Sequence, residues 1–290
     1  MRSSLPNIIE EIMDINDNVC VLIGDISHYL FRNVEKKFPN KFYNLGIAEQ
    51  SLISLASGLS LEGMIPIVHS IAPFVTERCY EQIKLDIGYQ NQEIIIISVG
   101  ASFDYAHLGC SHHCYNDISI LRLIPNIDIY SPGSKLELDY ILKNKIGNGV
   151  PKYIKIYNQS HSYDKIEIPH KFHLINEGND DKVIIFLGSM LFEMGDEFKN
   201  STILYSNTCT NFSSEEINNL KKLTKGKEVF VIEENNINGG FGDYISEILQ
   251  VNINKIGIPN NFIEKYGTYA EIKNYVSLNN KSIFKQVYEN

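Results

Sequence analysis

The sequence predicts an α/β protein of two doubly wound domains, and three observations support this. Short apolar runs rich in β-branched residues, typical of parallel strands buried on both faces, alternate with longer segments of helical periodicity. A chain of 290 residues that is 43% hydrophobic is long enough for two cores. The alternation stops once, in a polar stretch, and then resumes. We therefore expect domains at residues 1–160 and 181–290, joined by a linker at residues 161–180.

The elements of each domain follow from this pattern. In the first domain we expect strands at Val19–Gly24, Ile65–His69, Glu93–Val99 and Ile127–Tyr130, and helices at Asn7–Asp14, Ile47–Leu61 and Phe74–Ile87. In the second we expect strands at Val183–Gly188 and Val229–Glu233, and helices at Ser213–Leu223, Asp243–Leu249 and Ile283–Val287. Ser213 and Glu216 have the spacing of a capping box.

Composition excludes several classes of function. The net charge of −9 argues against a nucleic-acid binder, which needs concentrated Lys and Arg. No apolar stretch approaches the roughly 18 residues of a membrane-spanning helix, and the first residues do not resemble a secretory signal. The five cysteines form an odd, unpatterned set that suits a reducing compartment. We expect a cytoplasmic protein with neither a membrane nor a nucleic acid as partner.

The densest polar cluster is Gly109–Asp117, with the sequence GCSHHCYND. Its cysteines and histidines could ligate zinc, but they crowd together, whereas zinc sites usually draw on two separated pairs. Two other interpretations are a polar loop with buried thiols and an active-site loop that presents a histidine.

Two glycine-containing turns are also candidates. Glu49, in NLGIAEQ, falls in the first turn of an expected helix, where the helix dipole alone would favour an acidic residue. The turn Gly239–Gly242 follows a strand and precedes a helix, but it lacks the full GxGxxG pattern of a dinucleotide site. The simpler interpretation of Gly239–Gly242 is a turn whose glycines allow the strand and the helix to pack closely.

Several segments, taken together, resemble one family. FYNLGIAEQSLISLASGLSLEG, IPIVHSIAPFVTERCYEQIKL and GCSHHCYNDISILRLIPNIDIYSP closely resemble the pyrimidine-binding domain of transketolases. VFVIEENNINGGFGDYISEIL and IGIPNNFIEKYGTYAEI look like the C-terminal domain of the same family. The resemblance covers nearly the whole chain, in the order and spacing of the family.

The resemblance implies a binding site for thiamine diphosphate. Glu49 matches the glutamate that hydrogen-bonds the aminopyrimidine ring, where a carboxyl is needed to give a proton to a ring nitrogen. Phe74 matches an aromatic residue that packs on this ring. Ile71, which replaces a second aromatic residue, and Ile26 match positions near the ring.

The resemblance also implies substrate contacts. His112 matches a histidine that contacts substrate oxygens and assists proton transfer, and Arg2 matches a position near the sugar phosphate. His107 and His113 are additional polar groups that we expect to contact substrate. Five positions depart from the family pattern. Leu108 replaces an acidic residue and Gly100 a histidine, and near the sugar phosphate Tyr29 replaces a serine, Gln92 a histidine and Asn158 an arginine.

The departures point away from ordinary sugar phosphates, because asparagine cannot replace the bidentate, charged contact of arginine with phosphate. We expect a transketolase-like enzyme that transfers a two-carbon ketol unit between sugars. One of these sugars is expected to be modified or nucleotide-linked, with a role in surface-polysaccharide synthesis.

The GDG…N motif with which the family holds diphosphate and Mg²⁺ is absent from the sequence. The chain is thus expected to be the C-terminal, or β, subunit of a split enzyme. A separate N-terminal subunit would carry the motif and the metal in an α2β2 assembly, and this chain alone would be inactive. The alternatives are the β subunit of a 2-oxoacid dehydrogenase, a deoxyxylulose-phosphate-synthase-like protein, a noncatalytic structural subunit and, least favoured, a dinucleotide-binding protein.

Overall fold

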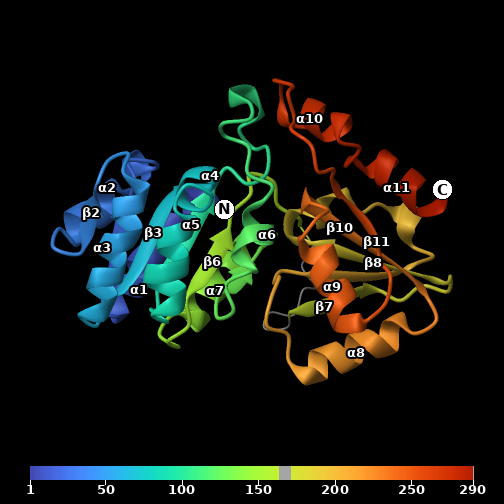
Figure 1. The fold of residues 1–290 in the computed structure, drawn as a ribbon, viewed down its shortest axis with the longest axis horizontal. Coiled ribbons are helices and arrows are strands. Elements are labelled where there is room, and N and C mark those ends of the chain that lie inside the picture. The colour runs from blue at the N-terminus through green and yellow to red at the C-terminus, as the bar shows by residue number, and fades with distance from the viewer. Residues whose placement is uncertain (163–170, 290) are drawn as a thin grey trace.

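The computed structural model describes residues 1–162 and 171–289, which form two α/β units lying side by side (Figure 1). The first unit contains a parallel sheet with the strand order β2-β1-β3-β4-β6-β5. Its strands are β1 (Val19–Ile23), β2 (Phe42–Asn44), β3 (Ile65–Ile71), β4 (Ile95–Val99), β5 (Asp128–Tyr130) and β6 (Lys152–Lys155).

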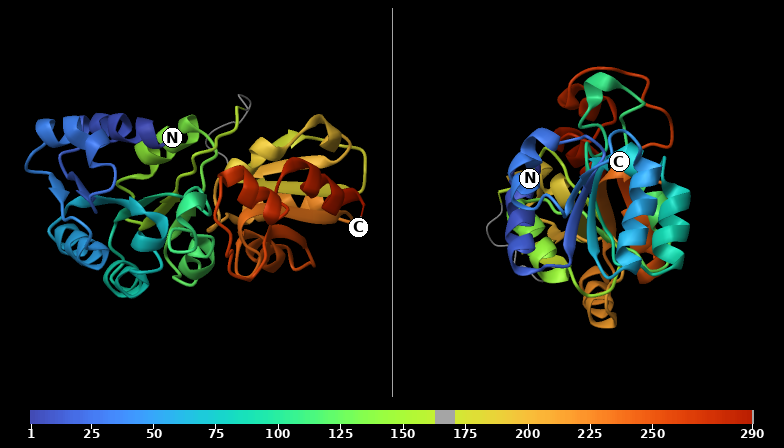
Figure 2. Two further views of the ribbon diagram at one scale, coloured as in Figure 1. Left: turned by 90° about the horizontal axis from the view of Figure 1, so that it is seen from above. Right: turned by 90° about the vertical axis from the view of Figure 1, so that its left-hand side faces the viewer.

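Helices cover both faces of this sheet (Figure 2). Alternate residues of β1 point to opposite faces and are all buried, which explains why the strand is a continuous apolar run. One face is covered by α1 (Leu5–Ile15), α2 (His28–Lys37) and α7 (Lys135–Lys145). The other is covered by α3 (Glu49–Leu61), α4 (Ala72–Val75), α5 (Tyr80–Gln82), the π-helix η2 (Ile83–Tyr89) and α6 (Asp117–Leu121).

The second unit is built on a sheet with the order β11-β10-β8-β9-β7, in which only β7 runs antiparallel to its neighbour. Its strands are β7 (Phe172–Asn176), β8 (Lys182–Leu187), β9 (Thr202–Ser206), β10 (Glu228–Asn236) and β11 (Asn254–Ile258). Helices α8 (Ser214–Thr224) and α9 (Phe241–Leu249) pack on one face, and α10 (Tyr269–Tyr275) and α11 (Asn280–Tyr288) on the other. The predicted fold class, two α/β domains, is confirmed.

Two local predictions from the sequence have opposite outcomes. The single helix predicted at Phe74–Ile87 is wrong, because the segment consists of α4, a turn, α5 and η2. Thr76 contributes to the break by donating its hydroxyl hydrogen to the carbonyl oxygen of Ala72, at 2.6 Å. The capping box at Ser213 and Glu216 is confirmed, with both of its hydrogen bonds present.

The predicted linker also contains a strand. Residues 163–170 of the expected linker, 161–180, lie outside the described residues, and its later part forms β7. The sequence did not predict this strand, because an edge strand with mixed polarity lacks the continuous apolar run of its buried neighbours. The domain boundaries themselves stay a prediction.

The two units are tied together by buried polar contacts. Lys155, at the end of β6, forms an ion pair with Asp117 of α6 at 2.9 Å and donates to the side-chain oxygen of Asn235 on β10 at 2.6 Å. One apolar cluster also runs continuously from the α3 face of the first sheet to the α8 and α9 face of the second. No helix among the described residues is both long enough and apolar enough to span a membrane.

Candidate active site

The candidate residues gather at the carboxyl edge of the first sheet. Because β1, β3, β4 and β6 are parallel, the loops that follow them emerge on the same side. These loops carry Ile26 and the polar segment of residues 100–116. Phe74 lies in α4, directly after β3, and Glu49 opens α3 after the turn that follows β2. Segments far apart in the sequence are thereby brought to one place.

Glu49 is the buried acid of this edge. Its residue is only 1% exposed at the first position of α3. Ser70 donates a hydrogen bond to its Oε1 at 3.2 Å, and Arg78 Nη1 donates to its Oε2 at 2.7 Å. At Gly24, a Cβ atom would stand 3.2 Å from the Ser70 hydroxyl, so the glycine lets the end of β1 approach this pair closely.

Phe74 and His112 extend the site outward from Glu49. The Arg78 guanidinium carbon stands 4.2 Å from the centre of the Phe74 ring, a cation–π contact. On another side, the Phe74 ring meets His112 edge-on, with their centres 5.2 Å apart. Burial, with a smaller effect from His107, lowers the pKa of His112. A flat, nitrogen-bearing group therefore fits between Glu49 and Phe74, because the flat guanidinium of Arg78 already makes both contacts.

A second polar network begins at His69, which is fully buried on β3. His69 Nδ1 donates to the Ile97 carbonyl oxygen at 2.9 Å, so its Nε2 accepts from the Ser27 hydroxyl at 2.9 Å. Ser27 Oγ in turn accepts from Arg2 Nε at 3.1 Å. Burial lowers the pKa of His69 to about 4, so the ring is neutral at pH 7 and suited to this accepting role.

Tyr105 joins the two networks. Arg2 Nη1 donates to its hydroxyl oxygen at 3.0 Å, and its ring lies 6.1 Å from that of His112. Gly100 has a φ of +77°, and a Cβ atom there would come within 2.3 Å of the Tyr105 ring. Tyr105 therefore fills the space that a side chain at position 100, a histidine in the family pattern, would need.

A cavity of about 640 Å³ lies beside this second network. It brings together three of the positions that the resemblance placed near the sugar phosphate: Arg2, Tyr29 and Asn158. Gln92 is not among them, because it precedes β4 at the opposite edge of the sheet, where its side chain donates to the Gln90 carbonyl oxygen. Arg2 is the one Lys or Arg among the described lining residues, and Asp25 lines the same cavity. The side-chain charge around it is therefore nearly balanced.

The other predicted residues fall in different settings. Ile26 lines the same cavity, and Ile71 is buried at the end of β3 next to Gly100. His107 is exposed, whereas His113 is only 4% exposed, and its burial lowers its pKa. The roles of all eight predicted site residues stay predictions.

The zinc interpretation of the GCSHHCYND cluster is not supported. Cys110 is exposed, whereas Cys114 is buried, with its sulfur 3.6 Å from the Thr76 hydroxyl. Within residues 1–162 and 171–289, no group of three or more His, Cys, Asp or Glu side chains is placed to hold a metal ion. The loop instead combines one buried thiol, that of Cys114, with the half-buried His112, so it has features of both remaining interpretations.

The dinucleotide interpretation of Gly239–Gly242 also loses support. The backbone amides of Phe241 and Gly242, at the start of α9, each donate to a carboxylate oxygen of the buried Glu233 at 2.8 Å. A phosphate at this helix start would have to displace that internal carboxylate. The turn is thus capped by the protein's own acidic side chain.

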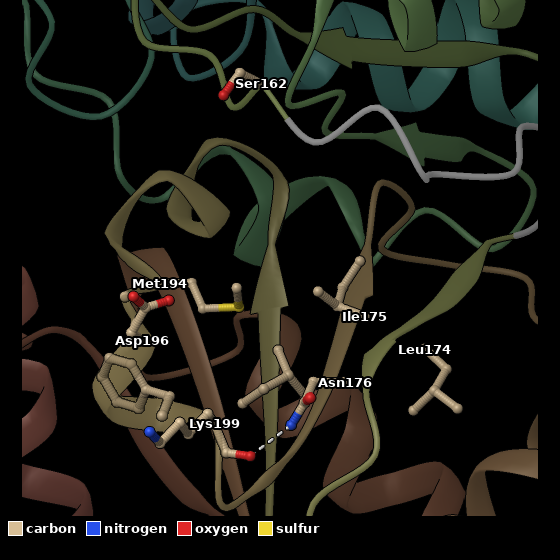
Figure 3. A pocket seen from close by; sticks show the side chains of 10 residues that line it. Ser162, Leu174, Ile175, Asn176, Met194, Asp196 and Lys199 are labelled. Atoms are coloured by element: carbon tan, nitrogen blue, oxygen red, sulfur yellow. Dashed lines mark hydrogen bonds between the residues drawn. The ribbon is translucent and has the colours of Figure 1, made fainter.

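Another cavity, of about 430 Å³, lies in the second unit, against β7 and β9 (Figure 3). Its described lining includes Leu174, Met194 and Phe198 but none of the eight predicted site residues. Asn176 points across it and donates to the Lys199 carbonyl oxygen at 2.9 Å.

Four further residues of the candidate site were not predicted from the sequence: Ser70, Arg78, His69 and Tyr105. Each contacts a predicted residue through space rather than along a regular element. Arg78 carries the clearest signal, because its four-residue spacing from Phe74 would place both on one face of the predicted helix, although the segment is not one helix. The other three become neighbours only when the parallel strands assemble.

Comparisons with known proteins identify the family of the chain. Residues 1–156 match the family model described as "Transketolase, pyrimidine binding domain". The chain is 30% identical, over 223 residues, to one subunit of the apulose-4-phosphate transketolase of Actinobacillus succinogenes, a match that covers 74% of this chain and 71% of that protein. It is 30% identical over 247 residues to 1-deoxy-D-xylulose-5-phosphate synthase of Halothermothrix orenii, covering 79% of this chain but only 38% of the synthase.

The fold has a match along nearly its whole length. A solved structure described as "Split gene transketolase, inactive beta4 tetramer" superposes with a TM-score of 0.84 at 24% identity, covering 99% of this chain and 96% of that one. At that identity the likeness concerns the fold alone. Together with the family model and the relative at 30% identity, it shows that the chain belongs to the transketolase family and corresponds to the C-terminal half of a transketolase.

Proposed function

We propose that this chain is the β subunit of a heteromeric, thiamine-diphosphate-dependent enzyme that transfers a two-carbon ketol unit between sugars. The observation that carries the proposal is Glu49, a buried acid beside an aromatic face at the carboxyl edge of the sheet. Support comes from a relative named as one subunit of a transketolase and a structural neighbour described as a split-gene transketolase. An N-terminal subunit would supply the diphosphate and Mg²⁺ site, and two copies of each chain would form the assembly.

The described residues suggest separate roles for the cofactor and for the side chains around it. When bound, thiamine diphosphate supplies the carbanion chemistry that the protein's own side chains cannot. Glu49 Oε2 would hold a proton at a nitrogen of the pyrimidine ring, Phe74 would pack on one face of that ring, and Ile71 and Ile26 would keep water from it. His112, half-buried beside Phe74, is placed to exchange a proton with a substrate oxygen.

The cavity beside Arg2 supports an unusual sugar. A phosphate dianion is best held by several cations, but here the one described arginine shares the lining with Asp25. The volume of about 640 Å³ leaves room for a larger group. We propose that one substrate is a modified or nucleotide-linked sugar used in surface-polysaccharide synthesis, and that the chain acts in the cytoplasm.

The test is a two-carbon transfer assay on the complex of this chain with its N-terminal partner. Glu49→Ala is expected to abolish transfer while leaving the complex intact, because Glu49 is only 1% exposed and contributes little to the surface of this chain. Unchanged transfer by this variant would favour a noncatalytic subunit. Turnover of xylulose 5-phosphate and ribose 5-phosphate at ordinary transketolase rates would contradict the proposed substrate class.

A second candidate function has specific support. The similarity to 1-deoxy-D-xylulose-5-phosphate synthase covers 79% of this chain. The same complex should then form 1-deoxy-D-xylulose 5-phosphate, which the transketolase proposal does not predict. Product analysis by mass spectrometry separates the two.

A further inference from the structure

Arg78 occupies the centre of the candidate site. Its Nη1 donates to Glu49 Oε2 at 2.7 Å, and its guanidinium carbon lies 4.2 Å from the centre of the Phe74 ring. The first contact is a charge-assisted hydrogen bond to a buried carboxylate, and the second places a flat cation over an aromatic face. No other described residue contacts both side chains in this way.

These two contacts are the ones that the proposed function assigns to the pyrimidine ring. Both groups are flat and bear nitrogen, so the guanidinium and the ring would compete for the same acidic oxygen and the same aromatic face. The remaining oxygen, Oε1, already accepts from Ser70 at 3.2 Å. Glu49 and Phe74 therefore cannot make these contacts with Arg78 and with the pyrimidine ring at the same time.

The two partners of the ion pair differ in their freedom to move. The Glu49 side chain is only 2% exposed, and its backbone belongs to α3. The Arg78 side chain is 38% exposed and projects from the turn between α4 and α5. The guanidinium can swing into solvent without a change of backbone, whereas the carboxylate stays in place.

We infer that Arg78 is a gate: it holds Glu49 and covers Phe74 in the free subunit, and it must swing away when the pyrimidine ring of thiamine diphosphate binds. The inference rests on the proposed function. Its consequence is that part of the cofactor's binding free energy is spent on breaking the ion pair between Arg78 and Glu49. Removing the guanidinium should thus tighten binding.

The test is calorimetric titration of thiamine diphosphate into the complex of this chain with its N-terminal partner. Arg78→Met keeps the apolar stem but removes the charge, and it is expected to lower Kd roughly tenfold or more, the range of one charge-assisted hydrogen bond. Lys37→Met is the matched control. It removes a surface cation that pairs with Glu10 and Asp14 on α1, and it should leave Kd unchanged.

Two further variants keep the test decisive. Arg78→Gln retains an N–H donor for the buried carboxylate, so it should fold even if Arg78→Met does not, and it should also lower Kd. In a Glu49→Gln background the charge opposite Arg78 is already removed, so Arg78→Met should lower Kd by a clearly smaller factor than it does in the wild type.

The outcomes distinguish failure of the Arg78 gate from failure of the proposed function. If the wild-type complex binds thiamine diphosphate and the Arg78 variants bind it equally or more weakly, the gate is overturned while the proposed function stands. If the wild-type complex binds no thiamine diphosphate, both fail.

Discussion

At the residue scale, two buried carboxyl groups of the first unit, Glu49 and Asp104, have different surroundings. Glu49 accepts hydrogen bonds from Arg78 and Ser70. Asp104, in the loop after β4, accepts one from the Asn158 amide at 3.0 Å, but its Oδ1 is buried without a hydrogen-bond partner among the described residues. A carboxyl that is only partly satisfied resists ionisation, because burial penalises its charged form. Asp104 should therefore keep its proton to a higher pH than an exposed aspartate does.

Asp104 gives a prediction about pH. Burial, with repulsion from Glu234, raises the pKa of Asp104 from its usual 3.8 to about 8 in the folded protein. Between about pH 4 and pH 8 the unfolded chain loses this proton while the folded chain keeps it, so stability falls as the pH rises through that window. Asp104→Asn has no proton to lose and should escape this fall.

Thermal unfolding at several pH values measures the effect. The melting temperature of Asp104→Asn minus that of the wild type should become more positive from pH 5 to pH 8. A difference that stays constant across this range would show that Asp104 is ionised in the folded protein at pH 5.

His112 carries a catalytic prediction. Its ring lies against Phe74 and near Tyr105, so a substrate oxygen above Phe74 would be within its reach. In the complex, His112→Asn should lower kcat about a hundredfold, the lower range for loss of a general acid or base, with the Kd of thiamine diphosphate unchanged. A parallel loss of cofactor binding would instead assign His112 to the cofactor site.

At the element scale, the loop of residues 100–116 is the least regular part of the site. It stands beside the segment between β11 and α10 of the second unit, where the Tyr115 hydroxyl donates to the Asn261 carbonyl oxygen at 3.2 Å (Figure 1). A Cβ atom at Gly109 would come within 2.4 Å of the Tyr266 ring. The shape of the loop therefore depends on both units of the chain.

Gly100 at the start of this loop allows a direct test. Gly100→Ala places a methyl group at a φ of +77° and within 2.3 Å of the Tyr105 ring. Backbone strain and overpacking should together cost about 1–3 kcal/mol in the free energy of unfolding.

Displacement of Tyr105 should also break its hydrogen bond with Arg2 and raise the KM for the sugar that enters the cavity. Chemical denaturation and steady-state kinetics measure the two effects. Gly149→Ala is the control, because its φ is also positive but nothing lies within 4 Å of the added Cβ atom. Equal destabilisation by both variants would show that backbone strain alone is responsible.

The elements also show what the sequence can and cannot predict. The continuous apolar runs of β1, β3, β4 and β8 were predictable because both faces of each strand are buried. The edge strand β7 was missed, and the region of α4 and α5 was predicted as one helix because its apolar spacing does not reveal the break at Thr76. Arg78, the proposed gate, projects from that break.

The residues of the candidate site likewise fall into those that the sequence predicted and those that it did not. Glu49 and Phe74 were found through motifs that are continuous in the sequence. Ser70 and His69 were not, because a strand pattern shows that a polar residue is present but not which side chain it will meet on the next strand. Contacts between elements far apart in the chain are therefore the part that needed the structure.

At the scale of the whole molecule, the two units share a core as well as polar contacts. The apolar cluster under α3 continues under α9, and the fully buried Lys155 joins residues of both units. The candidate site lies at the carboxyl edge of the first sheet, and its loop of residues 100–116 contacts the second unit through Tyr115. The proposed partner subunit would contribute the rest of the site, including the diphosphate and metal contacts.

The most direct measurement of the central claim is calorimetric titration of thiamine diphosphate into three samples: this chain, an N-terminal subunit with a GDG…N motif encoded beside it, and the purified complex of the two. We predict stoichiometric binding to the complex, at most weak binding to either chain alone, and severe weakening in a complex that carries Glu49→Gln. Failure of the chains to co-purify, or equal binding with and without this chain, would contradict the account.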